Sequence, residues 1–159
     1  MSERRLDAIA LDVDGVLTDG GFWWGPDGAE WKRFCFADVM GIARGRRAGL
    51  VFALISGEDS PLIDRFAAKL GITAIYKGCK DKGAALRDFS GQAGIPLARI
   101  GFMGDDVNDL PALALAGLSA APANAQPPVL EAVALRLPQR GGDGAVRAFV
   151  ELVLAGEAG

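Results

Sequence analysis

Hydrophobic and polar positions along the chain follow two patterns: short apolar runs, and longer segments with the spacing of amphipathic helices. The apolar runs predict buried strands at 9–11, 51–55, 72–76, 100–103, 118–120 and 134–137. The segments between them predict helices at 39–49, 61–70, 82–93, 110–116 and 144–154. Strands that alternate with helices are typical of a mostly parallel sheet with helices on both faces. We therefore expect an α/β fold with a single domain over residues 1–159.

Residues with known end preferences mark several of these helix boundaries. Asp38 is expected to be the N-cap of the helix that ends at Gly49. Ser60 precedes Pro61, and proline is favoured at the first position of a helix. Gly71 follows the predicted end of that second helix.

Residues 20–36 interrupt the alternation with aromatic side chains around a turn signal, Gly-Pro-Asp-Gly at 25–28. We predict a β-hairpin with strands near 21–25 and 29–35. All three tryptophans of the chain lie in it, and a two-stranded ribbon alone is marginally stable. A subunit interface is our preferred partner for this surface, and packing on the home domain stays open. The aromatic residues are Phe22, Trp23, Trp24, Trp31, Phe34 and Phe36.

Composition narrows the classes of function. Half of the 159 residues are hydrophobic, which is typical of a folded globular protein. The net charge of −3 argues against a nucleic-acid partner, because such a partner needs a basic face. The sequence shows neither a bilayer-spanning apolar run nor the hydrophobic region of a signal peptide, so we expect no membrane partner.

Two residue types are scarce. The only cysteines, Cys35 and Cys79, are too few for a disulfide framework and favour a reducing cytoplasm. We expect both to be small buried side chains rather than catalytic thiols. The chain has no histidine, which excludes histidine bases, serine–histidine triads and histidine metal sites. Acid–base chemistry near neutral pH therefore falls to carboxylates and lysines.

The first apolar run stops at two carboxylates, Asp12 and Asp14, which Gly15 follows. The carboxyl end of a buried strand is where open α/β sheets bind ligands. Two like charges this close are costly away from water, and a bound cation would offset their repulsion. A plain turn is the alternative, since Asp and Gly favour turns. A calcium loop is excluded, because Leu17 and Trp23 occupy positions that need glycine and glutamate.

Other candidate side chains also follow predicted strands, so we expect all of them at one edge of the sheet. Each has a plain structural alternative: Ser56 and Gly57 suit a turn, and Lys82 suits a solvated surface. Three aspartates in five residues after the fourth strand exceed what helix capping needs, and a hard cation prefers such oxygen ligands. They are Asp105, Asp106 and Asp109.

Together these residues predict phosphoryl transfer through a covalent intermediate. Asp12 is expected to attack phosphorus, and Asp14 to protonate the leaving oxygen and then activate water. We expect Mg²⁺ between Asp12, the main-chain carbonyl of Asp14 and Asp105. Asp106 and Asp109 would hold metal-bound waters or the lysine. The residues expected to bind the phosphoryl oxygens are Ser56, Gly57 and Lys82.

In order and spacing, these motifs resemble those of the haloacid dehalogenase superfamily: residues 12–19, Ser56-Gly57, Lys82, and Gly104-Asp105-Asp106 with Asp109. Over nearly the whole chain, the sequence resembles the small capless branch of 3-deoxy-D-manno-octulosonate 8-phosphate phosphatases. The resemblance implies a three-layer Rossmann-like fold with the hairpin as an insertion near 20–36 and no cap domain. It also implies Mg²⁺-dependent hydrolysis of a sugar-acid phosphate, that octulosonate phosphate before others, for lipopolysaccharide synthesis.

The resemblance further implies a homotetramer in which the hairpins associate and a neighbouring subunit restricts entry to the site. Residues 37–40 and Asp143 depart from this branch, because they lack positive charges that it usually carries near the sugar. Lys32, Arg140 and Arg147 are candidates for substrate contacts, although a solvated role for the two arginines stays open. The departures leave a nonulosonate 9-phosphate or another small phosphomonoester as an alternative substrate.

A signalling receiver domain is the alternative from another class, because it also uses a phosphorylated aspartate, an acidic metal site, a hydroxyl and a lysine. A receiver does not need an acid–base residue two positions after the nucleophile, so Asp14 argues for hydrolysis. A non-catalytic subunit with the same fold would be expected to lack Asp12, Asp14 or Asp105, and all three are present.

Overall fold

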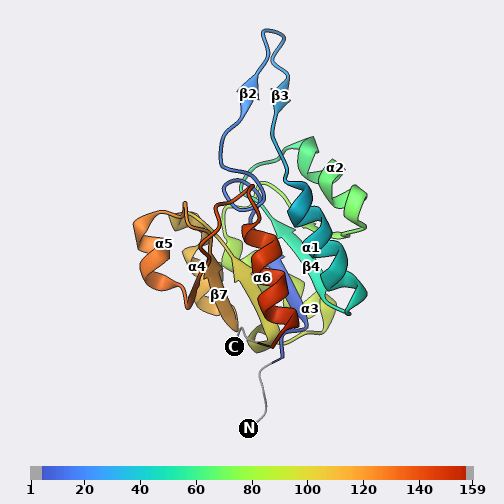
Figure 1. The fold of residues 1–159 in the computed structure, drawn as a ribbon, viewed down its shortest axis with the longest axis vertical. Coiled ribbons are helices and arrows are strands. Elements are labelled where there is room, and N and C mark those ends of the chain that lie inside the picture. Colours follow the sequence, from blue (N-terminus) through green and yellow to red (C-terminus); the bar gives the residue numbers. More distant parts are fainter. Residues whose placement is uncertain (1–4, 157–159) are drawn as a thin grey trace.

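A parallel sheet of six strands forms the centre of the protein, and helices cover both of its faces (Figure 1). The computed structural model describes residues 5–156. The strands lie in the order β5-β4-β1-β6-β7-β8, and every neighbouring pair runs parallel. The α/β prediction is therefore confirmed. The strand bounds are Ala8–Leu11 (β1), Val51–Ile55 (β4), Ala74–Tyr76 (β5), Ile100–Met103 (β6), Leu118–Ala121 (β7) and Leu135–Arg136 (β8).

Each face of the sheet carries its own hydrophobic core. Side chains alternate between the faces along a strand, so Ile9 and Leu11 of β1 enter one core while Ala8 and Ala10 enter the other. Helices α1, α2 and α6 cover the first face, and α3, α4 and α5 cover the second. The helix bounds are Phe36–Arg47 (α1), Pro61–Leu70 (α2), Lys82–Ala93 (α3), Leu110–Leu115 (α4), Pro127–Ala132 (α5) and Ala145–Leu154 (α6).

Helices α1 and α6 lie side by side on the sheet, and this contact overturns the prediction made for Asp38 (Figure 1). Helix α1 begins at Phe36 after the N-cap residue Cys35, so Asp38 lies inside the first turn and does not cap it. Asp38 is fully buried, and its Oδ1 accepts a hydrogen bond from the Arg147 N–H of α6 at 3.0 Å. A Cβ at Gly41 would come within 2.7 Å of the Arg147 side chain, which explains the close approach of the two helices.

Helix α2 is capped by the two residues that the sequence predicts, Ser60 and Gly71. The strand after it is shorter than predicted. The Ser60 hydroxyl accepts a main-chain N–H of the first turn at 3.2 Å, and Gly71 follows the helix with φ of 70°. Strand β5 begins at Ala74 and not at 72. The N–H of Ile72 is already bonded to the Ala67 carbonyl at the end of α2, so it is not free to join the sheet.

Helix α5 and two 3₁₀ turns, Leu97–Arg99 (η1) and Val107–Asp109 (η2), were not predicted. The pair Pro127-Pro128 suggests a loop, yet proline is accepted in the first turn of a helix, and Val129 packs into the second core. No helix within residues 5–156 is both long enough and apolar enough to cross a membrane.

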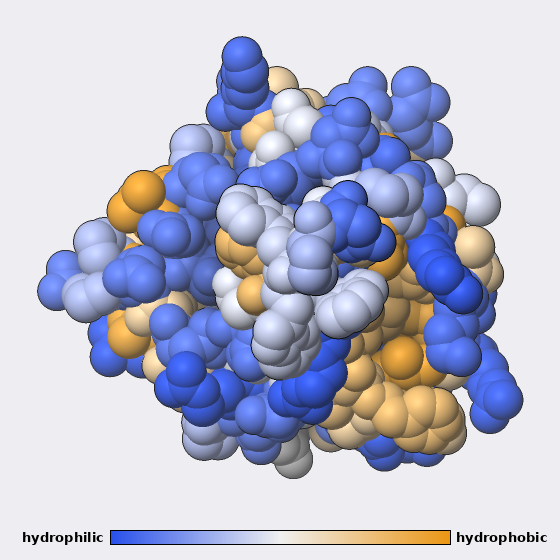
Figure 2. Space-filling model, turned by 90° about the horizontal axis from the view of Figure 1, so that it is seen from above, coloured by the Kyte–Doolittle hydropathy of each residue, from blue (hydrophilic) through white to orange (hydrophobic). Residues whose placement is uncertain are grey.

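The aromatic hairpin projects from the carboxyl end of the sheet (Figure 1). Its strands, β2 (Trp23–Trp24) and β3 (Glu30–Trp31), are shorter than predicted and pair Trp23 with Trp31 and Trp24 with Glu30. Trp23, Trp24 and Trp31 are 59%, 71% and 61% exposed, so the three tryptophans do not pack on the home domain, whereas Phe34 at the hairpin base stacks on Phe66 of α2. Figure 2 looks down on this end and shows an orange hydrophobic area beside a largely hydrophilic surface.

Candidate active site

The carboxyl ends of three neighbouring strands meet at one pocket of about 350 Å³. Asp12 follows β1, Gly57 follows β4 and Asp105 follows β6. Because β4, β1 and β6 are adjacent, these side chains share one edge of the sheet, as the strand-end argument predicted. The pocket is lined by Asp12, Asp14, Gly20, Gly57, Glu58, Lys82, Asp105, Asp106 and Asn108.

Lys82 lies at the floor of this pocket between two carboxylates. Its side chain is only 1% exposed, so the solvated-surface alternative is wrong. Its Nζ lies 3.0 Å from Asp12 Oδ1 and 2.7 Å from Asp109 Oδ1. Burial alone would lower the pKa of Lys82, but the charges of Asp12 and Asp109 raise it above its ordinary value. The lysine therefore stays a cation and can hold the nucleophile candidate in place.

Negative charge exceeds positive charge around Lys82. Carboxylate oxygens of Asp12, Asp105 and Asp109 lie within 4.8 Å of one another. Burial, followed by the charge of Asp109, raises the pKa of Asp12 well above its usual value. Burial likewise raises the pKa of Asp105 to about 6. A divalent cation would remove this repulsion, and oxygen donors of this kind suit a hard ion such as Mg²⁺.

The hydrogen bonds separate candidate ligands from residues that orient them. Both oxygens of Asp109 are engaged: Oδ1 pairs with Lys82, and Oδ2 accepts the N–H groups of Asp105 and Asp106 at 2.9 and 3.3 Å. Asp106 Oδ1 accepts the N–H of Val107 and caps η2. This leaves the carboxylates of Asp12 and Asp105 as the residues best able to hold a metal ion.

Asp105 lies so close to the loop after β1 that only glycine fits opposite it. A Cβ at Gly15 would lie 1.8 Å from Asp105 Oδ2, and Gly15 has a φ of 82°. The glycine of the first motif thus has two physical reasons, a left-handed backbone and the close approach of a carboxylate.

The phosphate-binding candidates occupy two depths. Gly57 lines the pocket, together with Glu58, whereas Ser56 is fully buried and does not line it. The Ser56 Oγ accepts the Glu58 N–H at 3.1 Å, so it closes the turn after β4. The turn alternative for Ser56 is therefore part of what the structure shows, and the turn presents Gly57 to the pocket.

The loop that carries Asp14 is held from both sides. Thr18 Oγ1 accepts the N–H groups of Gly15 and Gly20 at 3.2 and 3.1 Å. Asn124 donates to the Gly15 carbonyl at 3.0 Å and accepts the Gly141 N–H at 2.6 Å. Sequence reasoning missed Asn124, because its two partners lie in other segments of the chain. It also gave no role to Gly20, Glu58 and Asn108, which line the pocket and lie within or directly after the marked motifs.

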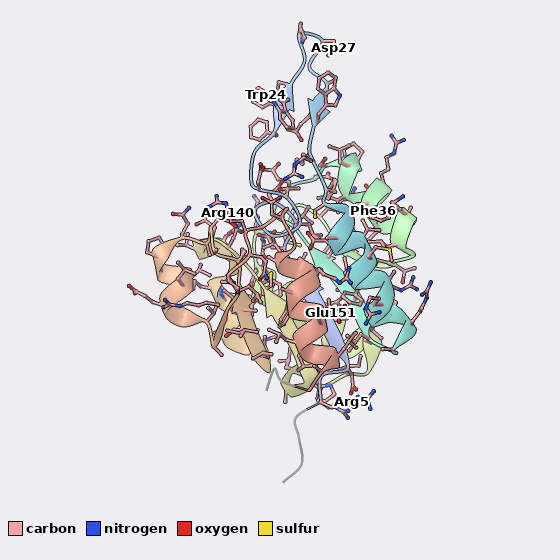
Figure 3. The ribbon with its side chains drawn as sticks, in the orientation of Figure 1. Arg5, Trp24, Asp27, Phe36, Arg140 and Glu151 are labelled. Atoms are coloured by element: carbon pink, nitrogen blue, oxygen red, sulfur yellow. The ribbon has the colours of Figure 1, made fainter. Side chains whose placement is uncertain are left out.

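The three candidates for substrate contacts take different positions. Lys32 Nζ lies 2.7 Å from Asp14 Oδ1. Arg140 is exposed on a loop at the hairpin end of the molecule (Figure 3). Arg147 pairs with Glu151 at 3.0 Å, one turn farther along α6 and away from that end (Figure 3). Only Lys32 is therefore brought to the acidic pocket.

Asp143, where the branch usually has a basic residue, forms an ion pair with a nearby arginine. Arg33 Nη2 lies 3.1 Å from Asp143 Oδ1 and 3.2 Å from the Gly142 carbonyl. The ion pair joins the base of the hairpin to the loop before α6. The Asp143 carboxylate is thus paired with a cation from the hairpin base.

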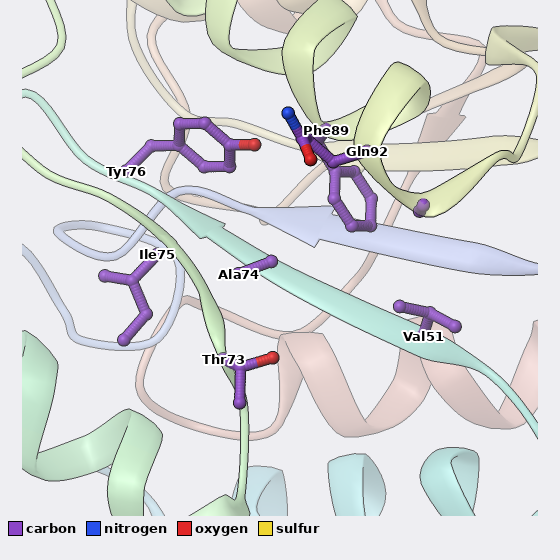
Figure 4. A pocket seen from close by; sticks show the side chains of 8 residues that line it. Val51, Thr73, Ala74, Ile75, Tyr76, Phe89 and Gln92 are labelled. Carbon is purple, nitrogen blue, oxygen red and sulfur yellow. The ribbon is translucent and has the colours of Figure 1, made fainter.

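Two other hollows bring fewer candidate residues together. A groove of about 570 Å³ runs beside the hairpin base, where the rings of Phe34 and Phe66 stack at 4.4 Å and where Lys32, Arg65 and Lys69 supply positive charge. A hollow of about 460 Å³ lies along β5 between Val51, Tyr76 and Phe89 (Figure 4). The second hollow contains none of the predicted site residues.

Known proteins are similar to this chain in both sequence and architecture. Residues 49–149 match the haloacid dehalogenase-like hydrolase family. The 3-deoxy-D-manno-octulosonate 8-phosphate phosphatase of Haemophilus influenzae is 38% identical over 151 residues, which are 95% of this chain and 84% of that protein. The cobalt-bound structure of the phosphatase from that organism has a TM-score of 0.93 at 37% identity, over 98% of this chain and 91% of that one. The phosphatase of the same name from Moraxella catarrhalis, crystallised with magnesium, phosphate and KDO, has a TM-score of 0.94 at 34% identity, over 98% of this chain and 89% of that one.

Proposed function

The chain belongs to the haloacid dehalogenase-like hydrolase family, and from that premise we propose that it is a Mg²⁺-dependent phosphatase for 3-deoxy-D-manno-octulosonate 8-phosphate. One observation carries the proposal. Asp12 and Asp14 line the same pocket as Lys82 and Asp105, so nucleophile, acid–base group, cation and metal ligand share one site. The choice of substrate rests on the names of the phosphatases that the chain resembles.

Asp12 is the proposed nucleophile. Its Oδ1 is fixed by Lys82 and by the Val13 N–H at 2.7 Å, which leaves Oδ2 to attack phosphorus. As the new oxygen–phosphorus bond forms, the bond to the sugar oxygen breaks, and Asp14 gives that oxygen a proton. In the second step Asp14 takes a proton from water, and the water oxygen attacks phosphorus. The bond between phosphorus and Asp12 Oδ2 breaks, which regenerates the Asp12 carboxylate and releases inorganic phosphate.

The remaining residues balance the charge of the phosphoryl group. Lys82 and the Gly57 N–H are proposed to bind its oxygens, and Ser56 shapes the turn that presents Gly57. Asp12, Asp105 and the main-chain carbonyl of Asp14 would hold Mg²⁺, which would supply positive charge to the transferring oxygens. Asp109 is proposed to orient Lys82 and the loop of Asp105, and Asp106 to cap η2 at the pocket rim.

The sugar end of the substrate is proposed to lie toward the groove beside the hairpin. Arg65 and Lys69 give this groove positive charge, and Phe34 and Phe66 give it an apolar floor. Such a surface suits a carboxylate-bearing sugar. Because Arg147 is paired with Glu151, we no longer favour it as the carboxylate ligand, while exposed Arg140 stays a candidate.

Assembly into a homotetramer through residues 20–36 is part of the proposal. Its support is the aromatic surface, since three exposed tryptophans on one short ribbon form the kind of patch that marks protein contacts. A neighbouring subunit would then restrict entry to a site that has no cap domain. We further propose that residues 1–159 form one catalytic domain and that the enzyme acts in the cytoplasm, in lipopolysaccharide synthesis. Two free cysteines agree with a reducing compartment.

The test is phosphate release from a panel of sugar phosphates, with Mg²⁺ and with chelator. Metal-dependent turnover that is fastest on 3-deoxy-D-manno-octulosonate 8-phosphate is the expected result. Faster turnover of a nonulosonate 9-phosphate would keep the mechanism and replace the substrate. No release from any member, with a stable phosphoprotein instead, would contradict the phosphatase assignment and favour a receiver-like role.

A further inference from the structure

The acid–base candidate Asp14 has a cationic partner that the phosphatase chemistry described above does not use. Lys32 Nζ lies 2.7 Å from Asp14 Oδ1, and the Lys32 side chain is only 3% exposed. Lysines beside an exposed ribbon usually extend into water, so this burial needs a cause. Within residues 5–156, Lys32 is the only lysine or arginine with a nitrogen within 4.0 Å of an Asp14 carboxylate oxygen. Lys82, the other buried lysine of the site, pairs with Asp12 and Asp109 instead.

Lys32 is held in place from both sides along the chain. It directly follows β3, whose Glu30 Oε2 lies 3.8 Å from the Lys32 Nζ. The other oxygen of Glu30, Oε1, accepts the indole N–H of Trp24 at 3.1 Å. After Lys32, the ring of Phe34 stacks on that of Phe66 of α2. A chain of polar contacts thus runs from the exposed indole of Trp24 through Glu30 and Lys32 to Asp14.

The contact restricts how Asp14 can take part in proton transfer. A free carboxylate side chain rotates and can present either oxygen to the leaving group. An ammonium bound to Oδ1 restricts that rotation and leaves Oδ2 available for proton transfer. Proton transfer needs the donor within hydrogen-bond distance of the leaving oxygen, and small displacements cost large factors in rate.

We infer that Lys32 is a positioning residue for Asp14. It orients the Asp14 carboxyl group for proton transfer to the leaving sugar oxygen, and it links Asp14 to the hairpin. This inference rests on the proposed phosphatase function. It also assigns Lys32 a task other than the substrate contact expected from the sequence. A lysine that contacts substrate would change the binding of the sugar, whereas a lysine that orients Asp14 changes the step in which the sugar leaves.

Leaving groups of different basicity distinguish the two tasks. A sugar or alkyl oxygen must be protonated as it leaves, whereas the p-nitrophenolate ion leaves readily without a proton. Single-turnover release of the alcohol isolates this first step from the later attack of water. Lys32→Met is expected to slow alcohol release from the sugar phosphate about 100-fold, within the range usual for general acids. For p-nitrophenyl phosphate, the fold loss in the rate of p-nitrophenol release should be smaller by a factor of at least about ten. The KM for the sugar phosphate should stay near that of the wild type.

Comparison with Asp14→Asn completes the test. If Lys32 acts through Asp14, the double variant Asp14→Asn, Lys32→Met should be no slower than Asp14→Asn alone, within about twofold. Lys32→Arg, which keeps the charge, should recover part of the rate and serves if the Met variant fails to fold. Arg44→Met removes an exposed cation that pairs with Glu151 of α6, away from the pocket, and should leave both rates near those of the wild type.

Three results would overturn the inference while the wild type remains an active phosphatase. They are an unchanged rate in Lys32→Met, equal losses for both leaving groups, and additive losses in the double variant. Absence of metal-dependent turnover in the wild type is a different result, because it overturns the proposed function and the inference with it.

Discussion

Asp38 places a buried carboxylate between α1 and α6, and its replacement tests what that charge does to stability. Its Oδ1 accepts the Arg147 N–H, and its buried Oδ2 has no hydrogen-bond partner within residues 5–156. Helix α6 begins after Gly144, which has no side chain to cap it. Asp38 therefore acts as a cap supplied by another helix, at the cost of burying a charge.

The magnitude follows from the pKa of this group. Burial, the largest cause, raises the pKa of Asp38 from 3.8 to about 6, against the opposing bonds from α6. A shift of about two units corresponds to ~3 kcal/mol. Below the unfolded pKa both states are protonated. Between the two values the folded state binds more protons, so stability falls as the pH rises, and above about pH 6 the whole penalty applies.

Asp38→Asn is therefore expected to gain stability relative to the wild type as the pH rises. The difference in unfolding free energy, variant minus wild type, should increase by up to ~3 kcal/mol between about pH 4 and pH 7. The asparagine amide has no partner at the position of Oδ2, which adds a pH-independent loss of about 1–3 kcal/mol. The pH-dependent part of the difference, and not its sign at one pH, is thus the quantity to test.

Urea unfolding without Mg²⁺, followed by circular dichroism across this pH range, measures it. Subtracting the wild type cancels the titration of Asp12 and Asp105, which both proteins share. Asp27→Asn is the matched control, because it makes the same chemical change at the exposed hairpin tip (Figure 3). If the Asp38→Asn difference changes with pH no more than the Asp27→Asn difference, the argument from burial is wrong.

Two further predictions concern the site and the hairpin. Asp12→Asn should lower turnover by more than about 10³-fold, measured as phosphate release, because it removes the proposed nucleophile. The same variant should unfold in urea no more easily than the wild type without Mg²⁺, since it removes a charge from a crowded buried cluster; a strongly destabilised variant would contradict that account. Trp23→Ala with Trp24→Ala should lower the molar mass measured by light scattering, and an unchanged mass would refute the hairpin interface.

The part of the site that was predictable from the sequence has a simple cause. In a parallel sheet the carboxyl ends of neighbouring strands lie together whatever the loops do. An apolar run that stops at Asp12, and another that stops before Asp105, therefore already place these residues in one pocket. Helix ends with local signals, such as Ser60 and Gly71, were predictable for a similar reason, because the cap and its partner are close in sequence.

The features that were missed depend on partners far along the chain. An aspartate at the start of a helix fits either a cap or the first turn, and the choice for Asp38 is made by Arg147, 109 residues away. Asn124 and Gly15 are also 109 residues apart, so nothing local marks Asn124 as a residue that holds the loop of Asp14. Arg147 was a reasonable candidate for a substrate carboxylate until the structure paired it with Glu151 of the same helix.

The ion pairs show how the parts of the site depend on one another. The carboxylates come from strand ends, but the cations that balance them come from α3 and from the hairpin: Lys82 pairs with Asp12 and Asp109, and Lys32 pairs with Asp14. Among the three carboxylates within 4.8 Å of one another, Asp105 alone has no cation within 4.0 Å in residues 5–156. Burial keeps its pKa near 6, so its ionised form is the costly one in this structure. A metal ion bound there would add the missing positive charge beside Asp12, the proposed nucleophile, although the site already holds two lysines.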